Sequence, residues 1–218
     1  MKISKDTGTK IRLLQAARKV FAERGLKNAT VRDICDLAEA NVAAVCYHFG
    51  SKEELYVAVL KDYLEGEERR HPRDRGVTPQ SPPEERLRAY VHSFLLQIVG
   101  DGDPVNERLG RRLTQEIIEP SQHFARIFEL HCRPTHELLL DIVGLLLPGA
   151  DQLTVSRCAS SIIGQCVLFD FAKEAITRMT PELELKASNI ESITDFIMDF
   201  SLGGIERMRS RLPATGMA

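Results

Sequence analysis

The chain has 218 residues, of which 43% are hydrophobic and 28% are charged. This composition is typical of a globular protein and excludes a disordered one, and the length allows one large domain or two modest ones. The net charge of −2 gives no sign of an anionic partner. No apolar run reaches the roughly 18–20 residues of a membrane helix, and the polar start is unlike a signal peptide. The five cysteines lack a C-x-x-C pair, which favours reduced thiols in the cytoplasm.

The charge is unevenly distributed along the chain. Residues 1–52 hold ten Lys and Arg against five Asp and Glu, a charge of +5, and the remaining residues carry 19 against 26, a charge of −7. A positive segment on a negative body indicates an anionic partner for that segment. All ten prolines lie at or beyond position 72, and four fall in the polar stretch 71–83, which predicts a linker.

Helical periodicity predicts four helices before this linker, over about 9–24, 30–38, 41–49 and 51–70. Gly25 is typical of a helix end. Thr30 and Asn41 are residue types that cap helix starts, and Ser51 with Glu54 forms a capping box. The two short helices in the middle follow a longer one and are separated by only a few residues. This is the helix-turn-helix arrangement, whose second helix enters the major groove of DNA.

Every segment after the linker also has the pattern of a helix, and none shows the alternation of strands with hairpin turns. The expected helices cover about 83–99, 105–118, 121–131, 134–147, 152–177 and 189–211. The sequence therefore predicts an all-α protein of about nine to ten helices. Residues 1–52 form a three-helix domain with a connecting helix over 52–70, and residues 71–218 form a larger helical domain.

The two short helices resemble the signature of TetR-type bacterial regulators. The resemblance is carried by Thr30-Val-Arg-Asp-Ile-Cys-Asp-Leu-Ala and by Asn41-Val-Ala-Ala-Val-Cys-Tyr-His-Phe-Gly-Ser-Lys-Glu-Glu-Leu55, with Phe21-Ala-x-x-Gly25 before them. Its most specific part is Tyr47-His48-Phe49 followed by Lys52-Glu53-x-Leu55. One position departs from the family pattern, because Glu39 occupies the turn where glycine is usual. A left-handed turn there costs glutamate steric strain, unless the turn differs locally.

Later segments are similar to the CecR-like (YbiH) subgroup of that family. These segments are Arg112-Leu-Thr-Gln-Glu-Ile-Ile-Glu-Pro-Ser, Arg133-Pro and Ile162-Ile-Gly-Gln-Cys, together with Asn41-Val-Ala-Ala in the second short helix. The resemblance implies a DNA-binding transcriptional regulator, a repressor that binds a palindromic operator as a homodimer and is released by a small-molecule ligand. Residues 71–218 are then the ligand-binding and dimerisation domain.

We expect DNA contacts from small and polar side chains on the second short helix and around it. The small side chains suit thymine methyl groups, and Arg32 is the strongest single candidate for a base or phosphate contact. The resemblance implies phosphate contacts from Tyr47, His48 and Lys52. The full set is Lys10, Thr30, Arg32, Asn41, Val42, Ala43, Ala44, Cys46, Tyr47, His48 and Lys52. Val45 and Phe49 are expected in the core, and Thr30 and Asn41 are alternatively only helix caps.

The larger domain is expected to hold a second copy of the chain and a ligand. The last two predicted helices provide the candidate dimer interface, with Ala159, Ile163, Val167, Ile193, Ile197 and Phe200. Apolar clefts with few polar groups are the usual sites for small molecules. The candidate ligand contacts are Gln115, Phe124, Phe128, Gln165, Phe169 and Phe171, each of which is alternatively a plain core residue.

Other functions have less support in the sequence. The chain lacks the motifs of common hydrolases and nucleotide-binding enzymes, so no enzyme activity and no cofactor are expected. His131, Cys132 and His136 offer a weak metal site in which Pro134 interrupts the spacing. Cys46 makes a thiol-based redox switch a second alternative, and a DNA-binding adaptor without a ligand is a third. The expected location is the cytoplasm, at the nucleoid.

Overall fold

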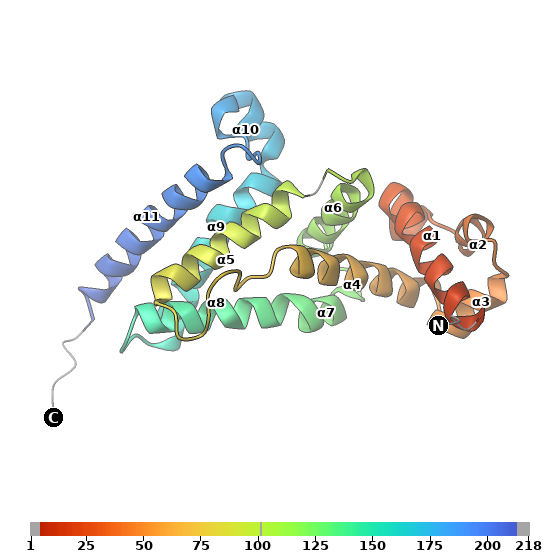
Figure 1. Ribbon diagram of the computed structural model, residues 1–218, viewed down its shortest axis with the longest axis horizontal. Coiled ribbons are helices and arrows are strands. Elements are labelled where there is room, and N and C mark those ends of the chain that lie inside the picture. Colours follow the sequence, from red (N-terminus) through yellow and green to blue (C-terminus); the bar gives the residue numbers. More distant parts are fainter. Residues whose placement is uncertain (1–4, 101, 213–218) are drawn as a thin grey trace. The chain divides into compact units, whose positions relative to one another are not determined.

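The computed structural model describes residues 5–100 and 102–212, without the side chains at 5, 6, 124, 130 and 131. Within these residues it contains eleven α-helices and no β-strand, which confirms the all-α class (Figure 1). The N-terminal helices are α1 (Lys5–Asn28), α2 (Val31–Ala38), α3 (Val42–Phe49) and α4 (Lys52–Arg70). Gly25 interrupts α1 with φ 68° and ψ 177°, so the regular helix ends at the predicted glycine.

The later helices follow the predicted order with two differences. They are α5 (Pro83–Val99), α6 (Pro104–Ile118), α7 (Phe124–Ile127), α8 (Arg133–Leu146), α9 (Gln152–Phe171), α10 (Lys173–Met179) and α11 (Ile190–Arg209). The helix expected over 121–131 is the short α7 followed by a π-helical turn (Phe128–Cys132). The helix expected over 152–177 is divided at Ala172 into α9 and α10. A short 3-10 turn (Pro181–Leu183) follows α10.

Contacts divide the chain into two compact units. Unit 1 contains residues 1–66 and 100–132, and unit 2 contains residues 67–99 and 133–218. The division differs from a simple cut at the linker, because α6, α7 and the π-helical turn pack with the N-terminal helices. Periodicity shows that a helix has an apolar face but not which partner covers it.

Unit 1 has its own hydrophobic core, in which α1, α2, α3 and α4 enclose side chains such as Phe21, Ile34 and Leu60. Leu109 from α6 and Ile127 from α7 are buried in the same core. The rings of Phe21 and Tyr56 meet edge to face with centroids 5.1 Å apart. Burial of apolar surface is the main favourable contribution to folding, and large rings such as these bury much of it.

Unit 2 is a bundle around a second core formed by α5, α8, α9 and α11 (Figure 1). Its buried side chains include Leu87, Leu139, Ile162 and Ile197. Arg88 on α5 bonds Glu191 and Asp195 on α11, at 2.9 and 2.7 Å. None of the described helices combines the length and the apolar character that a membrane crossing needs.

Candidate nucleic-acid interface

The start of α2 is fixed by a capping box. The Thr30 hydroxyl accepts a hydrogen bond from the Asp33 backbone N–H at 3.1 Å, and Asp33 Oδ2 accepts one from the Thr30 backbone N–H at 3.2 Å. Arg24 at the end of α1 bonds the same carboxylate at 2.7 Å. The hydrogen bond from the Thr30 side chain, supported by Arg24, lowers the pKa of Asp33. The Thr30 side chain therefore serves as a helix cap, whereas the neighbouring Arg32 is exposed.

Glu39 keeps the left-handed turn despite its side chain. Its backbone has φ 49° and ψ 50°, and it is the one residue other than glycine with a positive φ in the described part of the chain. The Ala40 N–H donates to the Cys35 carbonyl at 3.0 Å and closes the end of α2. The turn between α2 and α3 thus has the left-handed conformation for which glycine is usual. The exposed Glu39 adopts it with some steric strain.

The exposed face of α3 has the small and polar character expected of a recognition helix. Asn41 caps this helix, since its Oδ1 accepts a hydrogen bond from the Ala43 N–H at 2.9 Å. Val45 is buried in the core of unit 1, and Ala44 is partly buried against it. The residues that α3 exposes share one side of the helix, as their spacing requires. These residues are Val42, Ala43, Cys46 and Tyr47.

The aromatic triplet at the end of α3 points in more than one direction. Tyr47 is 76% exposed, so its ring is not part of the core. The His48 ring meets the Tyr47 ring edge to face at 4.9 Å. Phe49 packs partly against the core, and the Lys10 ammonium lies 5.8 Å from the centre of its ring. Lys10, Tyr47 and His48 therefore lie around the same end of the helix.

Lys52 has partners within the chain. Its ammonium donates hydrogen bonds to the carbonyl oxygens of Leu26 at 2.9 Å and Ala29 at 3.0 Å, which follow the Gly25 kink in α1 and precede α2. This holds the start of α4 against that segment. The phosphate contact implied by the resemblance stays a prediction, and an ammonium has three hydrogens, of which these bonds use two.

The candidate ligand contacts are distributed over both units. Gln115 and Phe128 belong to unit 1, and Gln115 is an exposed residue whose side chain accepts a hydrogen bond from Arg112 at 3.0 Å. Gln165, Phe169 and Phe171 belong to unit 2, where Phe171 is exposed. The side chain of Phe124 lies outside the described residues, as does that of His131, which was a candidate ligand of the alternative metal site. Neither of two open surface clefts of about 460–470 Å³ in unit 2 is lined by these candidates.

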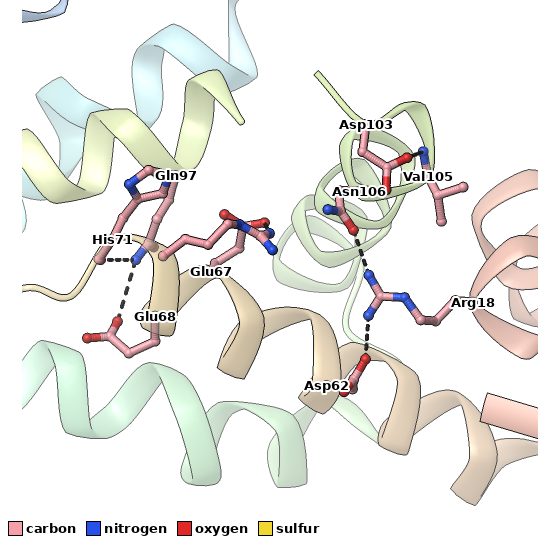
Figure 2. Close-up of polar contacts among 10 residues, drawn as sticks. Arg18, Asp62, Glu67, Glu68, His71, Gln97, Asp103, Val105 and Asn106 are labelled. Atoms are coloured by element: carbon pink, nitrogen blue, oxygen red, sulfur yellow. Dashed lines mark hydrogen bonds and ion pairs between the residues drawn. The ribbon is translucent and has the colours of Figure 1, made fainter. Parts of the chain in front are cut away.

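Sequence reasoning missed a group of polar side chains within unit 2. The buried Arg73 donates a hydrogen bond to Gln97 Oε1 at 2.5 Å, and its guanidinium lies 4.5 Å from the centre of the Phe94 ring. Gln97 in turn donates to the His71 carbonyl at 3.0 Å (Figure 2). No local signal marks Arg73 in the sequence, because it lies in the polar stretch that resembles a linker.

Three of the candidate dimer residues are buried within the chain itself. Ala159, Ile193 and Ile197 are 0%, 8% and 2% exposed, because they pack in the core of unit 2 rather than on its surface. Ile163 and Val167 are half-buried, and Phe200 is exposed. The same two helices also expose Leu153, Leu168 and Phe196, which the sequence did not single out, and the ligand candidate Phe171 at the end of α9. In the sequence these residues form a second apolar stripe along the same helices.

Comparison with known proteins agrees with this geometry. The family described as "Bacterial regulatory proteins, tetR family" matches residues 13–59, and "HTH-type transcriptional dual regulator CecR, C-terminal domain" matches residues 83–205. The dual regulator CecR of Shigella flexneri is 27% identical over 93% of this chain and 95% of its own. The repressor KstR2 of Mycolicibacterium smegmatis is 49% identical over 53 residues, which cover 24% of this chain and 26% of that protein.

A solved structure supports the fold over most of the chain. The regulator AibR, in complex with isovaleryl coenzyme A and operator DNA, superposes with a TM-score of 0.59 and 18% identity. The match covers 88% of this chain and 97% of that one. At this identity the likeness concerns the fold. Because the CecR C-terminal family matches more than half of the chain and the tetR family matches its helix-turn-helix, the protein belongs to the TetR family of bacterial transcriptional regulators, in the group defined by CecR.

Proposed function

We propose that this regulator represses transcription by binding a palindromic operator as a homodimer, and that a small molecule releases it. The observation that carries the DNA-binding part is the outer face of α3, which exposes small and polar side chains beside a capped and regular turn. One recognition helix covers half of a site, so two copies are needed for a palindrome. The protein acts in the cytoplasm, at the nucleoid, and carries out no reaction of its own.

Within this proposal, Arg32 and Tyr47 are the side chains most available to DNA. Both are exposed, whereas the side chains of Thr30 and Asn41 are used as helix caps. Val42, Ala43, Ala44 and Cys46 provide apolar contact to bases, and Lys10, His48 and Lys52 lie near the ends of α3 and contact phosphates.

The test is to select bound duplexes from a random DNA pool and to measure their affinity at several salt concentrations. Arg32→Ala combined with Tyr47→Phe is expected to weaken binding by about tenfold or more and to reduce the salt dependence. Lys61→Ala, an exposed change on α4, is the matched control for loss of one positive charge. Retained affinity in the double variant contradicts the assignment of this face.

The proposed dimer face consists of the outer sides of α9 and α11. It exposes Phe196 and Phe200 together with Leu168, and it also exposes glycines at 164, 203 and 204. A Cβ added at any of these glycines meets nothing within 4 Å in the chain itself. Packing inside the chain therefore does not require glycine there, and such small residues allow a helix from a second copy to approach closely. Ile163 and Val167 lie at the margin of this face.

The effector is proposed to bind within unit 2, where polar groups lie among aromatic rings. Gln165 donates a hydrogen bond to the Ser201 hydroxyl at 3.1 Å, and Arg73 and Gln97 form a second polar group beside Phe94. A few convergent polar groups in an apolar surrounding are typical of a small-molecule site. The test is to screen metabolites and drugs for release of the selected DNA. An effector that releases DNA from Gln97→Ala and from Gln165→Ala as readily as from the wild type contradicts this location.

A further inference from the structure

The helix α6 contacts the DNA-binding part of unit 1 along one of its faces. Asn106 on α6 accepts a hydrogen bond from Arg18 on α1 at 2.6 Å, and the same guanidinium bonds Asp62 on α4 at 2.5 Å (Figure 2). Asn106 is buried and the Arg18 side chain is largely buried. One arginine thus joins three helices, and buried charge-assisted hydrogen bonds of this kind fix geometry strongly.

Further along the same face, α6 approaches α4 very closely. A Cβ added at Gly110 would lie 2.9 Å from the Tyr63 hydroxyl, so a larger residue there would require the Tyr63 side chain to shift. Two turns later Glu116 is buried near Tyr56 of α4. Burial first, and then the Glu116 carboxylate, raise the pKa of the Tyr56 phenol, so the phenol stays protonated and can donate to that carboxylate.

Arg112 contacts the end of α1. Its guanidinium donates a hydrogen bond to the Glu23 carbonyl at 3.1 Å. It also lies against Gly25, where a Cβ would be 3.2 Å from its central carbon. Gly25, with φ 68°, is the kink at which α1 changes direction before the chain continues to α2. Arg112 therefore packs on the kink that precedes the helix-turn-helix.

The chain around the Gly25 kink, from Glu23 to Ala29, is held from two sides. Arg112 of α6 bonds the carbonyl of Glu23, while Lys52 of α4 bonds the carbonyls of Leu26 and Ala29. A segment fixed by charged donors at both ends has little freedom to change direction. Its direction sets where α2 and α3 lie relative to α1.

We propose that Arg112 is a positioning residue for DNA binding, which fixes the direction in which the helix-turn-helix leaves α1. This rests on the proposed function only through the DNA readout. Arg112 touches neither base nor phosphate; it acts by preorganising α2 and α3, so that binding does not have to order them. It also gives a role to the segment that begins at Arg112 and resembles the CecR-like group.

The test compares Arg112→Met with Arg111→Met. Both variants replace an arginine of α6 with a long helix-forming side chain and remove one positive charge, but Arg111 is exposed and Arg112 packs on Gly25. For a duplex selected from a random pool, Arg112→Met is expected to lose about tenfold in affinity, since hydrogen bonds from charged donors have about that effect. The slope of log affinity against log salt should match that of Arg111→Met.

Other outcomes overturn the proposal. They are equal affinities of the two variants, or a salt slope that falls by about one only for Arg112→Met, which would indicate a phosphate contact. Hydrogen exchange on the free protein provides a second measurement. Amides of residues 25–30 should exchange faster in Arg112→Met than in the wild type and in Arg111→Met, and unchanged exchange also overturns the proposal. If the wild type selects no DNA, the proposed function fails, and the exchange measurement alone decides the role of Arg112.

Discussion

The rings of Phe196 and Phe200 stack on the outer side of α11, with centroids 6.5 Å apart and an angle of 24° between their planes. They are 69% and 67% exposed, although the opposite side of the helix is buried in the core of unit 2. Covering one phenylalanine contributes roughly 1.5–3 kcal/mol. Covering this pair of exposed aromatic rings would therefore favour association with a partner of matching shape.

Phe200→Glu is expected to prevent the proposed homodimer from forming, because the new carboxylate would have to be buried between two copies. Sedimentation at micromolar concentration measures this, and the affinity for a full palindrome should fall with it. Leu183→Glu is the matched control, since it places the same charge at an exposed apolar position in the 3-10 turn. Dimers of unchanged affinity in Phe200→Glu contradict the proposed face.

Asp33 is expected to make stability depend on pH below about 4. Its hydrogen bond with Thr30 and its pairing with Arg24 lower its pKa in the folded state. The stabilisation is complete above the unfolded-state pKa of about 3.9 and is lost as the pH falls through the lower folded-state value. The difference in unfolding free energy between wild type and Asp33→Asn should therefore shrink over that range.

Arg24→Ala should shift this loss of stability to higher pH, because part of what lowers the pKa of Asp33 is removed. Lys27→Ala, at an exposed basic residue one turn later, should leave the pH profile as it is in the wild type. Identical profiles for wild type and Asp33→Asn would show that the capping carboxylate does not stabilise α2.

Glu39→Gly is expected to stabilise the protein by about 1 kcal/mol, since glycine adopts the left-handed turn without steric cost. It should also tighten DNA binding at low salt by removing a negative charge near phosphates. Glu39→Gln separates the two effects, because it removes the charge and keeps the strained conformation. A Glu39→Gly protein that unfolds at the wild-type temperature contradicts the strain argument.

Lys52→Met is expected to lower the unfolding free energy by about 1–3 kcal/mol, because two carbonyl groups lose a charged donor. Lys61→Met, an exposed change on the same helix, should have a much smaller effect. Chemical denaturation measures both. The salt slope of DNA binding then shows whether Lys52 also reaches a phosphate, as the resemblance implies, because loss of that contact lowers the slope by about one.

Cys46 is expected to react first with a thiol-alkylating reagent. It is exposed on α3, whereas Cys35 and Cys166 are buried, and burial raises the pKa of both thiols, that of Cys166 to about 12. Alkylation of Cys46 should block DNA binding, and bound DNA should protect it. Mass spectrometry and a binding assay measure these effects, with Cys46→Ser as the resistant control. Full DNA binding after alkylation of Cys46 would remove it from the interface and would also exclude the thiol switch.

Local sequence signals determined much of this protein. Thr30 and Asn41 cap helices where their side chains predict it, and Gly25 ends the regular part of α1. These signals work because a cap or a positive φ involves only neighbouring residues. The helix-turn-helix and the all-α class followed from the same signals, together with the family motif.

Only the tertiary structure decided which face of each helix is covered, and by what. The stripe with Ile193 and Ile197 and the stripe with Phe196 and Phe200 are equally apolar in sequence, yet the first is core and the second is exposed. Likewise, α6 packs with the DNA-binding helices, and Lys52 bonds carbonyl groups. Such choices depend on contacts between residues distant in the chain, and periodicity within one helix carries no information about them.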